Sequence, residues 1–355
     1  MGKNNPFYNI SSMNEKRITK STPLGYWSFL CLFIGFFLPI SAVLHSQSLD
    51  RFEYTEPKMG TEFRLVLYAS SQDQADKAAH AAFERVDALN KIMSDYDAGS
   101  ELSRLSMTAG TGQQTIVSKD LWAVLSLAQS IAKKSKGAFD VTIGPLSKLW
   151  RRAIRQKAFP DNAALATAKE KVCYKHLKLH TKTNSVSLTK EGMRLDLGGI
   201  AKGYTVDAIW GVLQSHGIQN ALIDGGGDIF AKGSPPDSQG WKVKMLTRKT
   251  RVPSLDFFDH ETKKWSKKQE QEKVVYLNDL AIASSGNTYK NLDFNGVKYS
   301  HIINPKTGLG ITHNEIINIS APNCALADAL ASALSVLNVK KGKRLLKKFP
   351  NCVLY

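Results

Sequence analysis

The chain has few cysteines. It contains four in 355 residues, and only Cys173, Cys324 and Cys352 follow the apolar amino-terminal segment. Their odd number and unrelated spacings exclude a disulfide framework and the paired spacing of a cysteine metal site. The chain also lacks internal repeats, and beyond residue 44 it has no apolar run of membrane-spanning length. We therefore expect residues 49–355 to form one large domain or two closely packed ones.

Acidic residues are outnumbered, with 31 Asp and Glu against 48 Lys and Arg and a net charge of +17. This balance raises the question of nucleic-acid binding. The lysines are spread along the chain in small pairs, however, and no aromatic residues alternate with them as in a base-stacking surface. We expect no nucleic-acid partner. A basic surface could attract an anionic dinucleotide or lipid, but a solvated surface is the simpler interpretation.

Residues 1–48 resemble an export signal. Four basic residues between Lys3 and Lys20 precede an apolar run from Leu24 to Leu44. This order is typical of a signal peptide, with Met1 or Met13 as the start, and the run is also long enough for an uncleaved anchor. In both cases the positive-inside rule predicts an exported body. We expect a periplasmic domain that is either soluble or tethered to the cytoplasmic membrane.

The most informative segment runs from Met193 to Asp207. Its first apolar residues alternate with Arg194 and Asp196, which predicts a half-buried strand, and Gly198-Gly199 then ends that strand. Apolar residues at helical spacing follow Lys202. A strand that passes through a glycine turn into a helix, with a lysine at the helix start, is suited to hold a phosphate. An ordinary strand-to-helix turn is the alternative.

Other segments predict a mixture of strands and helices without strict alternation, which indicates an α+β fold. The sequence predicts a strand at Phe63–Tyr68, helices at Gln72–Met93 and Ser118–Lys134, and a buried strand at Ala221–Ile229. The segment Thr247–Lys273 is highly polar and has no sustained period, so we expect a long surface excursion there.

Three groups of polar residues are candidates for chemistry. Asp328 and Ser332 share one face of a helix of small residues, which suits a magnesium site completed by phosphate oxygens, or a buried Asp held by backbone amides. His301 follows a predicted strand and precedes a Pro/Gly turn, where it is either a general base or a structural residue. The polar turn Ser284–Tyr289 offers amides and hydroxyls to an anion.

Taken in order, these segments resemble the FAD:protein FMN transferases of the ApbE family. The likeness covers essentially everything after the leader, and the eight matching stretches occur in the family's order. They are Met59-Gly60-Thr61, SDYDAGSELSRL from Ser94, GAFDVTIGPL from Gly137, LDLGGIAKGYTVD from Leu195, Gly226-Gly227-Asp228, ASSGN from Ala283, SHIINPKTG from Ser300 and ADALASA from Ala327. The resemblance implies mixed sheets with packed helices, in an architecture related to the T-fold.

The resemblance also implies roles for single residues. It assigns His301 to assist the transfer. It implies magnesium ligands in the Ala201 carbonyl, Asp328 and Ser332. It implies FAD contacts at Met59, Tyr96, Ala138, Phe139, Asp140, Gly198 and Tyr204. Two positions depart from the family pattern. Ser332 stands where Thr is usual and keeps the hydroxyl, whereas Asn304 replaces a commoner Asp and leaves the orientation of His301 open.

The function that this resemblance implies is magnesium-dependent transfer of the FMN moiety of FAD to a Thr or Ser hydroxyl of an acceptor protein, with release of AMP. The implied acceptor is a flavoprotein subunit of a membrane electron-transport complex. Two alternatives remain from the sequence: a magnesium-dependent FAD pyrophosphatase that gives free FMN and AMP, and a non-catalytic exported flavin-binding protein. The Asp328/Ser332 pair argues against mere flavin storage.

Overall fold

The computed structural model describes residues 48–247, 257–259, 264–266, 271–286, 291–313 and 315–355. The chain separates into two units, Met1–Ser46 and Gln47–Tyr355. The predicted leader lies outside the described residues, and so does most of the polar excursion between Thr247 and Lys273. Within the described ranges, no helix is both long and apolar enough to cross a membrane.

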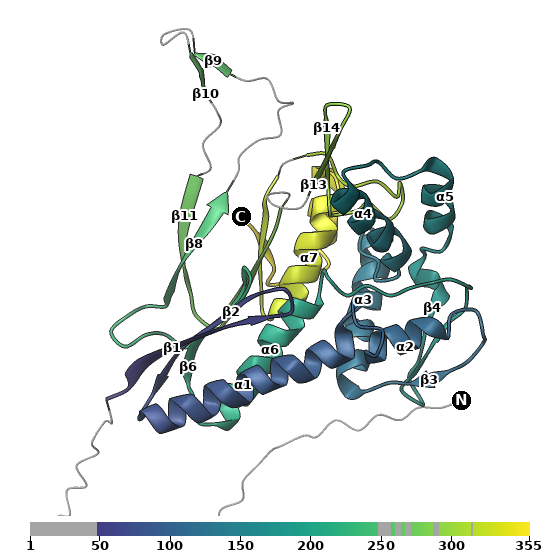
Figure 1. Cartoon of the computed structure of the whole chain (residues 1–355). Helices are drawn as coiled ribbons and strands as arrows, with labels where there is room; N and C mark the ends of the chain where they lie inside the picture. Colours follow the sequence, from purple (N-terminus) through teal and green to yellow (C-terminus); the bar gives the residue numbers. More distant parts are fainter. Residues whose placement is uncertain (1–47, 248–256, 260–263, 267–270, 287–290, 314) are drawn as a thin grey trace, which may run out of the picture. The chain divides into compact units, whose positions relative to one another are not determined.

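An antiparallel sheet of seven strands carries the functional elements, and neighbouring strands follow the order β1-β2-β6-β7-β12-β15-β16. Its strands β1, β2 and β6 are labelled in Figure 1. The strands in chain order are β1 (Asp50–Lys58), β2 (Thr61–Ala69), β6 (Asn220–Gly225), β7 (Asp228–Lys232), β12 (Leu280–Ser285), β15 (Ile317–Ala321) and β16 (Val353–Leu354).

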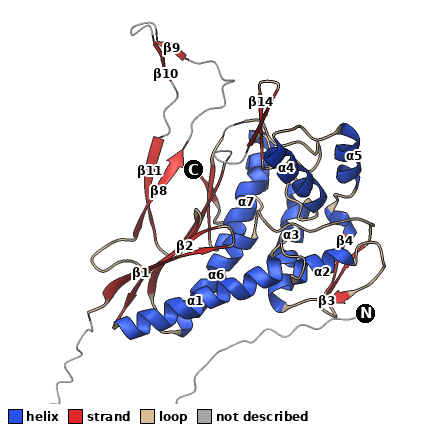
Figure 2. Cartoon of the chain, viewed as in Figure 1, coloured by secondary structure: helices blue, strands red, loops and turns tan. Residues whose placement is uncertain are grey.

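The two faces of this sheet have different coverings (Figure 2). Strand β2 shows the division, because Phe63, Leu65 and Leu67 enter one buried cluster while Val66 enters another. The larger cluster joins the sheet to three helices: α1 (Gln72–Met93), α6 (Ala201–Ser215) and α7 (Cys324–Val336). The smaller joins it to the hairpin of β8 (Trp241–Thr247) and β11 (Gln271–Leu277). The period of two along a strand produces this division.

Smaller elements surround this framework. A second sheet has the order β3-β5-β4, and β13 and β14 form a hairpin, as do β9 and β10. The strands are β3 (Thr115–Ile116), β4 (Leu177–His180), β5 (Ser185–Leu188), β9 (Phe257–Asp259), β10 (Lys264–Ser266), β13 (Asn291–Phe294) and β14 (Val297–Ser300). The helices are α2 (Glu101–Met107), α3 (Lys119–Ser135), α4 (Gly144–Gln156), α5 (Asn162–Glu170), the short 3₁₀ helix Tyr174–His176 and α8 (Val339–Leu346).

Periodic segments fold as the sequence predicts. Helix α1 has the predicted bounds, and α3 begins after Ser118, whose hydroxyl accepts the N–H of Leu121 at 3.2 Å. Such a side-chain cap satisfies one of the free donors at a helix start. Strand β2 extends the predicted Phe63–Tyr68 by a few residues at its ends. The α+β class is confirmed.

Three local predictions are wrong. Residues 193–197 do not form a strand, although Met193, Leu195 and Leu197 are buried. Their backbone groups bond to a loop and a side chain instead of a sheet: the N–H of Asp196 donates to Val141 and that of Leu195 to the Ser106 hydroxyl.

The other two errors concern turns. The predicted strand at Ala221–Ile229 is two strands, β6 and β7, because Gly226 and Gly227 both have positive φ and form a hairpin turn. Ser284 and Ser285, predicted to open a polar turn, belong to β12, and Asn287 lies outside the described residues.

Candidate active site

Helices α6 and α7 meet where the glycine turn ends. A Cβ placed on Gly203, in the first turn of α6, would lie 2.4 Å from the carbonyl oxygen of Cys324, so only glycine permits this approach. The carboxylate of Asp207 accepts the N–H groups of Cys324 (2.7 Å) and Ala325 (2.9 Å). These are free donors at the start of α7. The end of the LDLGGIAKGYTVD segment therefore ties the two helices together.

Asp328 is buried at this contact. Its side chain lies in the second turn of α7, and its Oδ2 accepts the N–H of Gly203 at 3.3 Å. The Nζ of Lys202 lies 3.9 Å from the same oxygen and forms a closer ion pair with Asp228, the first residue of β7. Asp328 thus has one backbone amide and one ammonium group as partners. Both sequence interpretations, a metal ligand and a carboxylate held by amides, are compatible with these contacts.

This cluster contains two carboxyl groups and one ammonium group. Burial lowers the pKa of Lys202, but Asp228 and Asp328 together have a larger opposite effect. The pKa of Lys202 is therefore raised, and the ammonium stays charged. Burial also raises the pKa of Asp228, with Asp328 adding to the effect and Lys202 opposing it. One ammonium group thus serves two carboxylates. The second carboxyl group is compensated either by a proton, which the rise of the Asp228 pKa to about 7 favours, or by a bound cation, because uncompensated buried charge is costly.

The other predicted magnesium ligands, Ala201 and Ser332, come from the same two helices as this cluster. A Cβ on Gly199 would lie 2.8 Å from the Ser332 hydroxyl oxygen and 3.3 Å from the Phe139 ring, so the glycine turn, Phe139 and Ser332 are in contact. The carbonyl of Ala201 is the first of α6 and accepts the hydroxyl of Thr205 at 2.8 Å. Carbonyl, carboxylate and hydroxyl oxygens are the donors that magnesium prefers, so the predicted set fits this ion.

The predicted set contains a single carboxylate. In the part of the chain that the structure describes, no group of three or more His, Cys, Asp or Glu residues could hold a metal ion. Ala201, Asp328 and Ser332 would therefore bind magnesium together with water or phosphate oxygens, which is the usual manner for this ion.

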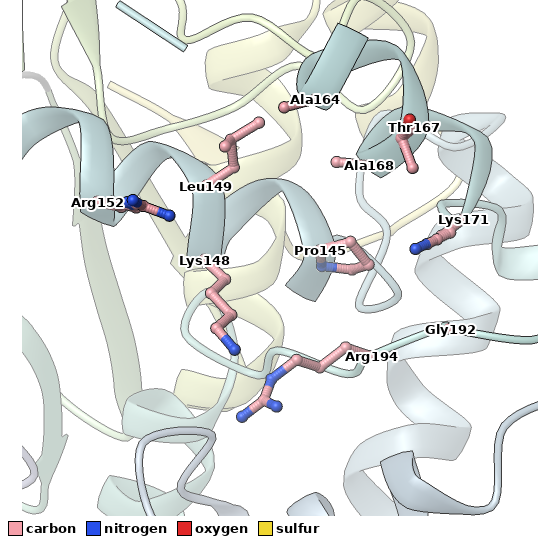
Figure 3. A pocket seen from close by; sticks show the side chains of 10 residues that line it. All are labelled: Pro145, Lys148, Leu149, Arg152, Ala164, Thr167, Ala168, Lys171, Gly192 and Arg194. Atoms are coloured by element: carbon pink, nitrogen blue, oxygen red, sulfur yellow. The ribbon is translucent and has the colours of Figure 1, made fainter. Parts of the chain in front are cut away.

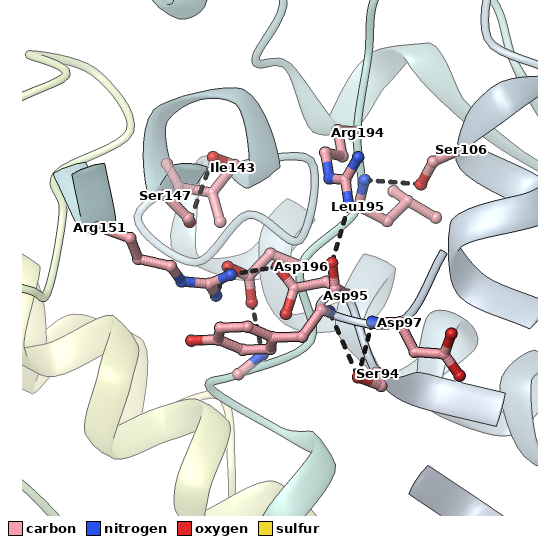
Figure 4. Close-up of polar contacts among 12 residues, drawn as sticks. Ser94, Asp95, Asp97, Ser106, Ile143, Ser147, Arg151, Arg194, Leu195 and Asp196 are labelled. Atoms are coloured by element: carbon pink, nitrogen blue, oxygen red, sulfur yellow. Dashed lines mark hydrogen bonds and ion pairs between the residues drawn. The ribbon is translucent and has the colours of Figure 1, made fainter. Parts of the chain in front are cut away.

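A second cluster surrounds Arg151 of α4 (Figure 4). Its guanidinium forms ion pairs with Asp95 and with Asp196, the latter at 2.7 Å. It also lies 4.2 Å from the ring centre of Tyr96. Asp196 in turn accepts the N–H of Gly198 at 2.8 Å. Tyr96 and Gly198, two predicted flavin contacts from distant segments, are joined through Arg151 and Asp196.

This cluster leaves Tyr96 available to a ligand. The tyrosine is 76% exposed although Arg151 covers part of its ring. An exposed aromatic ring held by a cation is suited to stack with a flat heteroaromatic ring. Burial raises the pKa of the neighbouring Asp95, and Asp196 raises it further, while Arg151 opposes both. Arg151 thus fixes the loop that carries Tyr96.

Two predicted FAD contacts, Met59 and Tyr204, lie beside or within α6. Met59 lies in the turn between β1 and β2 with φ of 49°, and its sulfur accepts the hydroxyl of Thr205 at 3.4 Å. The Tyr204 hydroxyl donates to Asp120 at 2.8 Å, and Arg85 pairs with the same carboxylate. Met59 is thus beside the first turns of α6, whereas the Tyr204 hydroxyl is bound within the protein.

The loop before α4 contains three more of the predicted FAD contacts. Ala138, Phe139 and Asp140 are buried. The Asp140 carboxylate accepts both the N–H (2.9 Å) and the hydroxyl (2.7 Å) of Thr142, and its second oxygen accepts the N–H of Tyr174 at 2.8 Å. Burial raises its pKa and these hydrogen bonds oppose the rise. In the structure Asp140 shapes the loop, and its contact with the flavin stays a prediction.

His301 is exposed and directly follows β14, as the sequence predicts. The side-chain oxygen of Asn304 accepts the N–H of Lys306 at 3.0 Å, which an aspartate could also do. The following turn packs on α4, where the Trp150 indole donates to the Gly308 carbonyl at 2.8 Å. Trp150 thus connects the His301 segment to the helix that also carries Arg151.

Sequence reasoning missed the charged partners. Asp95, Arg151 and Asp196 were not assigned, and Lys202 was assigned to a phosphate instead of Asp228 and Asp328. Asp196 had a signal, since it is a carboxylate beside the glycine turn. Arg151 had none, because Leu146, Trp150 and Ala153 mark a helix face but nothing in the local sequence shows which carboxylates this arginine meets.

Comparison with known proteins decides the family. Residues 59–354 match the model of the ApbE family. The chain belongs to the ApbE family. A curated ApbE-type relative from Treponema pallidum, named FAD:protein FMN transferase, is 33% identical over 312 residues, which are 84% of this chain and 82% of the relative. One with the same name from Vibrio cholerae is 30% identical and covers 81% of each chain.

Solved structures agree with this family assignment. The flavin transferase ApbE from Vibrio cholerae superimposes with a TM-score of 0.72 at 26% identity, covering 86% of this chain and 93% of the other. The ApbE protein from Thermotoga maritima has a TM-score of 0.70 at 25% identity, with 86% and 94% covered. The sequence-based identification with the ApbE family is confirmed.

Proposed function

We propose that this chain transfers the FMN moiety of FAD to a Ser or Thr hydroxyl of an acceptor protein. The names of its relatives support flavin transfer. The observation that carries the proposal for this chain is the contact of α6 with α7, where Asp328, Ser332 and Ala201 adjoin a glycine turn and a cluster of two carboxyl groups with one ammonium group. Such a place recruits a hard cation together with a diphosphate.

The reaction exchanges one phosphoester bond for another. The acceptor oxygen forms a bond to the phosphorus on the FMN side, the pyrophosphate bond breaks, and AMP leaves with the bridging oxygen. The hydroxyl proton passes to a base, which we assign to His301. Magnesium held by Ala201, Asp328 and Ser332 would neutralise the charge that develops on the pyrophosphate.

The remaining residues bind and orient FAD. Tyr96 stacks on the isoalloxazine ring, and Arg151 holds the tyrosine in place through its contact with the ring and its ion pair with Asp95. Asp196 holds Gly198, so that the glycine turn keeps its shape as the dinucleotide approaches. Positioning of this kind supplies much of the rate in phosphoryl transfer.

We also propose an exported location and an acceptor that is a flavoprotein subunit of a membrane electron-transport complex. The support is the basic and apolar leader, Lys3 to Leu44. A reporter that is active only in the periplasm, fused after Tyr355, should give a signal. Activity only from a reporter that requires the cytoplasm would contradict the location.

The transfer itself is tested by incubating the full chain with FAD, magnesium and a candidate acceptor, and weighing the acceptor intact. We expect a gain equal to one FMN phosphoester and one AMP released per acceptor. Free FMN with AMP and an unchanged acceptor would show a pyrophosphatase instead. Asp328→Ala should abolish transfer while its thermal unfolding stays cooperative, and full transfer by this variant would refute the metal assignment.

A further inference from the structure

A basic hollow of about 510 Å³ lies between α4, α5 and the segment that leads to the glycine turn (Figure 3). Its lining includes four cationic side chains and no acidic one. The cationic residues are Lys148, Arg152, Lys171 and Arg194. None of the assigned FAD or magnesium contacts lines it, so the hollow has no role in the function proposed above.

The positive charges of the hollow are largely not neutralised within the protein. Among the described residues none of the four forms an ion pair. Arg194 donates to a carbonyl, that of Asp95 at 2.8 Å, and Arg152 has only a 3.3 Å contact with Gln156. The Lys171 stem lies on Gly192, where a Cβ would be 3.0 Å from its Cε. Arg194 also acts electrostatically on the Asp95 carboxylate. Three cations without an acidic partner, with Arg194 beside them, favour an anionic occupant of the hollow.

The rest of the lining is mainly apolar, with Pro145, Leu149, Ala164 and Ala168 beside Thr167 and Gly192. The cationic groups are at the ends of long side chains that are exposed or half-buried. Small-molecule sites instead fix a few polar groups in an enclosed cavity. A rim of adaptable charge over an apolar base is complementary to a protein segment that has both acidic and apolar residues.

The hollow adjoins the flavin-binding loop. Lys148 and Arg151 are three residues apart on α4, so their side chains leave the helix about 60° apart. Lys148 lines the hollow, and Arg151 contacts Tyr96 and Asp95. Arg194 also belongs to both places, since it lines the hollow and bonds the Asp95 carbonyl. On a helix about 10 Å in diameter, two positions about 60° and three residues apart are separated by about 7 Å, which about two extended residues span.

We propose that the hollow docks an acidic, partly apolar segment of the acceptor protein while the hydroxyl to be modified lies at the flavin. This inference rests on the proposed function, because it names how that function selects its protein substrate. The docked segment is a few residues from the modified hydroxyl in space, and its carboxylates meet Lys148, Lys171 and Arg194 above the apolar base.

The test is direct binding, without FAD, of a fluorescent peptide in which glutamates surround a single leucine. Lys148→Glu with Lys171→Glu should raise the Kd about tenfold or more at low salt. Lys340→Glu with Lys341→Glu makes the same change in net charge on the exposed first turn of α8, and it should change the Kd by less than about twofold. Lys148→Gln with Lys171→Gln should give an intermediate Kd if each variant unfolds at the parent's temperature.

Three results would overturn the proposal. Equal losses in the hollow and α8 variants would mean non-specific attraction to a basic surface. Phosphate or AMP binding that only the hollow variant loses, with peptide binding unchanged, would assign the hollow to a small anion. The same pattern with vesicles of anionic phospholipid would assign it to a membrane. FAD binding, measured on each variant without an acceptor, reports on the flavin site of the proposed function independently of docking.

Discussion

Gly203→Ala tests whether the contact between α6 and α7 builds the site. The added Cβ would lie 2.4 Å from the Cys324 carbonyl oxygen, whereas ordinary contact begins near 3.4 Å. Because the obstacle is backbone, it cannot rotate away, so α7 must retreat by about 1 Å. This moves Asp328 and Ser332 away from the first turn of α6, and the 3.3 Å hydrogen bond from Gly203 to Asp328 is lost.

The expected change in stability is modest. Overpacking costs about 1–3 kcal/mol, while replacing a helical glycine by alanine returns about 0.5–1 kcal/mol. We therefore expect the free energy of unfolding to fall by about 1–2 kcal/mol. The effect on function should be larger, because a displacement of about 1 Å can reduce a rate about 100-fold. Magnesium affinity should fall about tenfold or more.

Gly211→Ala is the matched control on the same helix, since a Cβ there has no atom within 4 Å. It should raise the free energy of unfolding by about 0.5–1 kcal/mol and leave function unchanged. Urea unfolding, titration of magnesium in the presence of FAD, and single-turnover transfer measure the three quantities. If Gly203→Ala gains stability like the control and keeps parental magnesium affinity and transfer, the contact does not determine the site.

Three further predictions concern single side chains. Ser332→Thr should keep magnesium affinity because it keeps the hydroxyl, whereas Ser332→Val should lose it; equal affinities by calorimetry would show that the hydroxyl is not a ligand. His301→Gln should keep FAD binding, slow transfer about 100-fold or more and remove the rise in rate with pH that imidazole deprotonation causes, and superimposable pH profiles would exclude a general base. Burial raises the pKa of Asp207 to about 6 from its ordinary 3.8, against the opposing hydrogen bonds from α7. The folded state therefore binds a proton at the Asp207 carboxyl more tightly than the unfolded state does. The contribution of this proton to the free energy of unfolding is complete below about pH 4 and declines by about 3 kcal/mol as the pH rises to about 6. Relative to Asp207→Asn, urea unfolding of the parent should show this decline, and parallel pH curves would contradict it.

The sequence by itself determined the family, the α+β class and the regular elements with a strong period. Helix α1 has the predicted bounds because its apolar residues recur at helical spacing and Ser71 caps its start. Residues 193–197 show the limit of the same reasoning. Their alternation reports correctly that Met193, Leu195 and Leu197 are buried. It cannot report which backbone groups they bond to, and these belong to a loop.

Only the tertiary structure decided which charges meet. Asp95, Arg151 and Asp196 come from three separate segments, and Lys202 finds Asp228 and Asp328 on two other elements. No local pattern encodes such pairs, because each depends on how the sheet, α4, α6 and α7 pack. Burial then makes the pairing compulsory, since an unpaired charge is costly in an apolar interior. The same packing gathers the four cations of the basic hollow.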